Sequence, residues 1–224
     1  MSFGDPPPVP AAFWQARETL RTAECRPEIE LEDIPAPQRL APYAAAVGAS
    51  VYRPRVGSRD KDHTRANGYA AGPAHEHEDD ELAVGRLILL FDPDGQRGWG
   101  GPMRLVAYVR ADMEPEITSD PLLGPVAWSW LTESLEANGA EYAAAGGTVT
   151  RAVSEGFGNK AGDPVTTELE LRASWSPLQG DLSAHVAAWC DMMCLAAGIP
   201  PVPSDVAALP PRSSHREDPE SHRS

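Results

Sequence analysis

The sequence predicts an α+β protein in which an antiparallel sheet carries helices packed on one face. Residues 84–91 and 103–112 are two segments of strand length separated by a turn. Residues 148–157 and 165–175 repeat that arrangement nearer the C-terminus, and a segment with helical spacing of apolar residues follows each pair. Strands joined by short turns pair antiparallel, and helices that follow them cover one face of their sheet.

The N-terminal part is expected to form two helices around a short strand. Residues 12–24 predict a helix because their apolar residues recur at helical spacing, at Phe13, Ala16 and Leu20. Residues 28–32 alternate glutamate with Ile29 and Leu31, which predicts a strand with these two side chains inward. The alanine-rich stretch 38–47 is expected to be helical after Pro42.

The central hairpin is predicted by its turn. Residues 84–91 are a continuous apolar run, which is typical of a strand buried on both faces. Residues 92–95 (Asp-Pro-Asp-Gly) have proline second and glycine fourth, as in a β-turn. Residues 103–112 then return as the partner strand.

Capping residues mark the two later helices. Ser119 or Asp120 is expected to cap the first of them, and Gly139 to end it. Asp181 is expected to cap the last helix, which Gly198 closes. Each half of this region therefore reads strand, strand, helix, which makes it a candidate internal duplication.

Three segments are expected to be disordered: the N-terminus 1–12, an acidic insertion 54–81 and the C-terminal tail 203–224. They combine proline or charge with low hydrophobicity, which does not offset the entropy of ordering. One α+β domain, 13–202, remains around the mobile insertion.

Charge and composition exclude several classes of protein. The chain of 224 residues has a net charge of −14, and 21 acidic against 12 basic residues remain once the three segments are removed. An acidic folded surface argues against direct nucleic-acid binding and against anionic membranes. Apolar runs are too short to span a bilayer, and no secretory signal is evident. Three cysteines without such a signal predict a cytoplasmic protein.

No catalytic, cofactor or metal site is predicted. The segment from His75 to Glu81 holds many potential ligands, but it lies in the insertion and is interpreted as a solvated acidic loop. Cys190 and Cys194 lie one helical turn apart and are interpreted as buried apolar residues. Nucleophile-elbow, phosphate-loop and dinucleotide motifs are absent from the sequence.

The candidate partner-binding residues are tryptophans and arginines. Trp99 stands at a predicted hairpin tip, where it either anchors a partner or folds back over the sheet. Trp128 and Trp130 lie about 200° apart on a helix, so one of them is expected to meet a different surface. Arg104, Arg110 and Arg172 share outward strand faces, which are either solvated or form an open groove for an extended peptide.

Three blocks of sequence carry a family resemblance. They are 26–32 with 37–43, 120–123 with 128–133, and 147–151 with 170–175. Together they resemble an actinobacterial family catalogued as domain of unknown function 3000, over about residues 12–210. The resemblance implies no activity and no site, and it implies gene neighbours that include a ribonuclease-D-like exonuclease. Separately, the predicted order of elements is similar to the secretion-chaperone-like fold.

The first functional hypothesis is a non-catalytic cytoplasmic domain that binds another protein; its oligomeric state is left open. The alternative is an enzyme of unrecognised type, or an accessory factor to the neighbouring exonuclease. A deep polar-lined cavity would favour catalysis, whereas a shallow charged sheet face would favour binding.

Overall fold

A computed structural model describes residues 9–54 and 81–201, and these form an α+β fold with one antiparallel sheet. The six strands are ordered β1-β2-β3-β4-β6-β5. The elements are α1 (Ala11–Thr22), β1 (Ile29–Asp33), β2 (Tyr43–Tyr52), β3 (Glu81–Phe91), β4 (Met103–Asp112), α2 (Pro115–Thr118), α3 (Leu123–Ala137), β5 (Tyr142–Ser154), β6 (Thr166–Pro177) and α4 (Ser183–Ala196).

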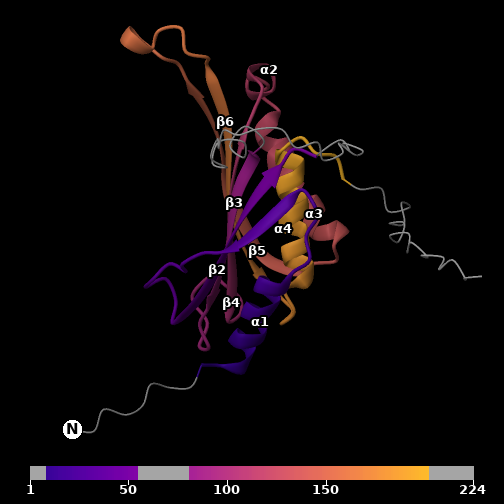
Figure 1. Cartoon of the computed structure of the whole chain (residues 1–224). Coiled ribbons are helices and arrows are strands. Elements are labelled where there is room, and N and C mark those ends of the chain that lie inside the picture. Colours follow the sequence, from indigo (N-terminus) through magenta and orange to yellow (C-terminus); the bar gives the residue numbers. More distant parts are fainter. Residues whose placement is uncertain (1–8, 55–80, 202–224) are drawn as a thin grey trace, which may run out of the picture.

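The helices α1, α3 and α4 form a layer against one face of the sheet, and the opposite face carries no helix in the described part of the chain (Figure 1). The strands explain this asymmetry because they alternate. On β4, for example, Leu105, Ala107 and Val109 are buried beneath the helices, while their neighbours face outward. The core therefore lies between the sheet and a single helical layer.

Helix α4 occupies the centre of that layer. It contacts α1, α3, β3 and β4, and nine of its 14 residues are buried. Its close approach to β3 depends on Gly85, because a Cβ there would lie 2.6 Å from the Met193 sulfur and 3.0 Å from Trp189. Helix α1 covers the neighbouring strands, where the Phe13 ring lies 5.5 Å from Tyr43 and 5.9 Å from Phe91.

The helix predicted within 38–47 is wrong. Tyr43 begins β2, which pairs with β1 on one side and with β3 on the other. Its side chains alternate, and Val47, Ala49 and Val51 are buried on the core side. Pairing on both edges thus overrides the helix propensity of the alanines.

The strand at 84–91 is confirmed, but its expected burial on both faces holds only near its end, where Leu90 is buried on the outward face. Leu87 and Leu89 are buried under the helices, whereas Arg86 on the other face is exposed. A continuous apolar run does not by itself distinguish a strand covered by helices on both faces from a strand like β3, which helices cover on one face. The expected ends of α3 and α4 are confirmed, since Gly139 and Gly198 follow them with φ of 66° and 71°.

Several predictions fall outside the described residues. These are disorder in 1–8, in most of 54–81 and in 203–224, together with the cluster that begins at His75. Glu81, the end of that cluster, is described and begins β3. Across 9–54 and 81–201, no helix is long and apolar enough to cross a membrane.

Candidate functional site

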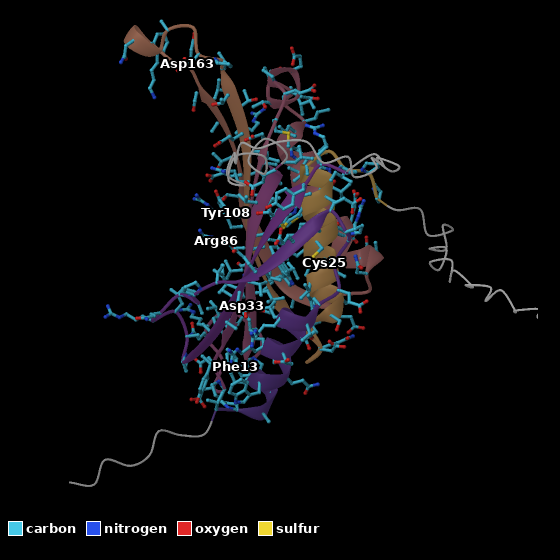
Figure 2. All side chains as sticks on the ribbon, in the orientation of Figure 1. Phe13, Cys25, Asp33, Arg86, Tyr108 and Asp163 are labelled. Atoms are coloured by element: carbon cyan, nitrogen blue, oxygen red, sulfur yellow. The ribbon has the colours of Figure 1, made fainter. Side chains whose placement is uncertain are left out.

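The uncovered sheet face gathers arginines at its centre and carboxylates towards its edges. The register aligns outward residues of successive strands into rows across the sheet. One row consists of Glu32, Gly48, Arg86, Tyr108 and Arg172, and the next of Glu30, Ser50, Val84, Arg110 and Glu170. Figure 2 shows Arg86 and Tyr108 on this open side, away from the helices.

A cleft of about 710 Å³ opens on this face over β2, β3 and β4. Gly48 forms part of its floor, and a Cβ there would come within 2.8 Å of Glu32 Oε1 and 3.1 Å of Ile34. The cleft therefore depends on a missing side chain between the Glu32 wall and the arginines Arg86 and Arg110 on the other side.

Tyr108 is the fixed polar group of the cleft. Its hydroxyl donates to Glu170 Oε1 at 3.2 Å, and the Arg172 guanidinium lies 5.6 Å from the centre of its ring. Arg172 also donates to Glu170 Oε2 at 2.8 Å. Burial, together with the charge of Glu170, raises the pKa of Tyr108. The phenol thus stays protonated as a hydrogen-bond donor, and Arg172 is already paired.

Arg86 and Arg110 retain binding capacity. Arg86 is exposed, and within the described chain it forms no ion pair, hydrogen bond or ring contact. Arg110 approaches Glu168 only to 3.8 Å, and both side chains are about half-exposed. Such a pair contributes little. Two guanidinium groups therefore border the cleft and are available to a ligand.

Arg104, the third predicted arginine on this strand, has a different role. It donates to the carbonyls of Ala144 and Ser174 at 2.9 and 3.2 Å and to the hydroxyls of Ser174 and Ser176. Burial lowers its pKa. Arg104 thereby ties β4 to β6 and β5. The outward position of Arg104 was predictable from alternation, but these partners were not.

The two predicted tryptophans lie outside the cleft. Trp99 is half-buried in the β3–β4 turn, where its backbone N–H donates to the Gln96 carbonyl. Trp128 is half-buried on the helix side, and a Cβ at Gly147 of β5 would lie 2.9 Å from it. Trp130 does meet a different surface, a second cleft that it lines with Ile117 and Leu195.

The cleft lacks a recognisable nucleophile and base among the described residues. Ser50 donates to Glu81 Oε2 at 2.8 Å, but a serine triad uses an imidazole to take the proton. His185, the histidine of the described segments, is buried on the helix side and accepts the Trp175 indole N–H at 3.1 Å. These segments also contain no group of three or more His, Cys, Asp or Glu side chains that could hold a metal ion.

The three cysteines gather on the helix side of the sheet, which the sequence did not predict. Cys190 and Cys194 are buried, as expected, and Cys25 lies half-buried against α4 (Figure 2). Contact with the Cys190 thiol lowers the pKa of Cys25, whereas this contact and burial raise the pKa of Cys190. Burial also raises the pKa of Cys194, to about 11. These thiols lie on the opposite side of the sheet from the cleft.

Comparison with known proteins identifies the family of the chain but no similar curated protein or solved structure. The model of the family described as protein of unknown function (DUF3000) matches residues 9–207. No curated protein and no solved structure matches the chain. The likeness to the secretion-chaperone-like fold rested on the predicted order of elements, and β2 adds a strand to that order.

Proposed function

The chain belongs to the DUF3000 family, and because that description carries no activity we propose from geometry that it is a non-catalytic, cytoplasmic protein-binding domain. Its uncovered sheet face holds a segment of a partner protein. The observation that carries the proposal is the cleft on this face, bordered by the weakly paired Arg110 and by Arg86, which has no partner among the residues that the structure describes.

Arg86 and Arg110 favour an acidic side chain on the partner segment, and Glu32 and Glu81, which also line the cleft, restrict where it can lie. A guanidinium binds a carboxylate through charge-assisted hydrogen bonds, and two of them border one opening. Ile34 and Val84 supply apolar contact beside them, and Tyr108 is held in a fixed position. Net acidity alone favours a neutral or basic partner. At physiological salt, charges more than about 8 Å away are largely screened, so the net charge of the whole chain has little effect on what binds in the cleft. The arginines that border the cleft therefore decide which side chain is favoured there.

Binding is favoured over catalysis by what surrounds the cleft. The opening lies on an exposed sheet face, its tyrosine is protonated, and its serine has no imidazole beside it in the described chain. A surface of this kind supports recognition by complementary charge and shape rather than bond breaking.

A displayed library of random peptides tests the proposal. Peptides enriched on the full chain are expected to share an aspartate or glutamate. Their affinity, measured by fluorescence anisotropy, should fall about 10- to 100-fold with Arg86→Glu, the loss expected for a charged hydrogen bond of about 1.5–3 kcal/mol. Arg17→Glu on α1, on the helix side, is the matched control and should change nothing.

A charge exchange distinguishes recognition from unfolding. Replacing the shared acidic residue of the peptide by lysine should abolish binding to the natural chain and restore it to the Arg86→Glu variant. Absence of any enriched peptide, or equal binding by the Arg86→Glu variant, would show that the cleft is not the binding site.

A further inference from the structure

The two edges of the sheet differ in how they are protected. β1 has five residues, three of them acidic: Glu30, Glu32 and Asp33. β5, the opposite edge, has 13 residues, contains no proline and carries one charged residue, Arg151. Short length and charge are the usual protection of an edge strand against pairing with another chain. By that measure β1 is protected and β5 is open along its outer side.

The single charge on β5 is already used within the fold. The Arg151 guanidinium donates to the carbonyls of Thr118 and Asp120, at 3.3 and 2.8 Å, and so closes the junction between α2 and α3. Thr148 and Thr150 are exposed on the open side of the same strand. The outer edge thus presents backbone groups, small residues and threonine hydroxyls, and in the described chain no strand pairs with it.

Apolar side chains flank this edge on the helix side. Val153 is 65% exposed, and its partner Thr167 faces the core, so Val153 projects to the same side as the helices. Leu122 is 64% exposed and lies two residues after Asp120, whose carbonyl Arg151 contacts. Val126 is 44% exposed and lies one helical turn after Leu122. An open edge beside exposed apolar residues is the composition of a strand-pairing interface.

We propose that β5 pairs antiparallel with β5 of a second copy of this chain, about a two-fold axis, so that two sheets become one. The register of β5 with β6 is regular over 146–154, which is the usable edge. When residues 146–154 of the two copies overlap fully, Thr150 of one copy lies opposite Thr150 of the other. Threonine pairs across strands are favourable, and Arg151 then faces an uncharged residue.

A second copy fits this edge better than an unrelated strand. Self-pairing of one antiparallel strand is closed by two-fold symmetry and uses the same surface twice. On the helix side of the joined sheet, this register sets Val153 of each copy opposite Gly147 of the other copy, beside Trp128, so the exposed valine is covered there. Each copy has a net charge of −14, but the edge itself sets no like charges opposite. Added salt should therefore strengthen the association by screening the remaining charge.

Sedimentation equilibrium of the full chain tests this arrangement. The natural chain is expected to reach the mass of two chains as its concentration rises, more readily in high salt. Thr150→Lys and Thr150→Glu should each sediment as one chain, because each sets like charges across the axis. An equimolar mixture of the two variants should regain the mass of two chains. The matched control is Thr22→Lys and Thr22→Glu, at the exposed end of α1, where neither change should matter.

The mixture separates edge pairing from misfolding, because two damaged chains would not repair each other. A natural chain that stays at the mass of one chain at the highest soluble concentration would overturn the proposal. Pairing of β5 with a β-strand peptide of another protein, but not with a second copy of this chain, would overturn it as well. Two-chain mass in both single variants, or its absence from their mixture, would also refute it. The pairing uses the sheet edge and leaves the Arg86 cleft free, so its result is independent of the proposed function.

Discussion

Acidification should destabilise the protein through His185, which lies buried between α4 and β6. The imidazole is 1% exposed, and its Nδ1 accepts the Trp175 indole N–H at 3.1 Å. Burial lowers the pKa of His185 from 6.5 to about 4, against a smaller opposing effect of Asp181. The ring is therefore neutral in the folded chain at a pH where the unfolded chain already binds a proton.

The magnitude follows from the difference between the two pKa values. Lowering a pKa from 6.5 to about 4 corresponds to about 3 kcal/mol in the free energy of unfolding. Above pH 6.5 neither state is protonated and the full stability is present. Between pH 6.5 and 4 only the unfolded state gains the proton, so stability falls with falling pH. Below about pH 4 both states are protonated and this loss stops growing.

Urea unfolding followed by circular dichroism, at pH values from 7 to 4, measures the loss. His185→Gln provides the comparison, because its side-chain carbonyl accepts the Trp175 N–H but does not titrate. Carboxylates away from this site, such as Asp33, contribute equally to both proteins, so the difference between the two curves isolates His185 together with its weak coupling to Asp181. The natural chain should lose about 3 kcal/mol more than the variant over this range. Parallel curves would refute the assignment.

Two further predictions concern the helix side of the sheet. Gly85→Ala should lower the free energy of unfolding by about 1–3 kcal/mol, since its Cβ would overlap Met193 and Trp189 beneath α4. Gly124→Ala, on an open part of α3, should have no such cost, and equal urea midpoints for the two variants would contradict this packing. Iodoacetamide at mildly alkaline pH should modify Cys25 before Cys190 and Cys194, because the contact with Cys190 lowers only the pKa of Cys25. Peptide mass spectrometry measures the order, and earlier labelling of Cys190 would contradict it.

Local patterns were sufficient to predict most of the fold. The apolar spacing in α1, the alternation in β6 and the glycines after α3 and α4 each act within a few residues, and the structure confirms them. β2 could not be identified in this way. Its alanines favour a helix locally, and only pairing with β1 and β3, which lie far apart in sequence, makes it a strand.

The candidate site was predictable only in part. Alternation correctly placed Arg110 and Arg172 on the outward face, because the period of a strand is two residues. Arg86 was missed, since it interrupts an apolar run that suggested burial on both faces. The cleft depends on the long-range register of Gly48 with Arg86 and of Arg86 with Tyr108. Pairing between distant strands leaves no local pattern from which such a register could be read.

The central place of α4 has a consequence for the synthesis of the chain. This helix covers β3 and β4 and contacts both α1 and α3, yet within residues 9–54 and 81–201 it is the last element in sequence. A ribosome releases the strands first, so their inner apolar faces have no central cover until the residues of α4 emerge. We expect chains that stop before Ser183 to aggregate rather than to accumulate as folded fragments. Emergence of α4 from the ribosome is thus the event that allows this core to close.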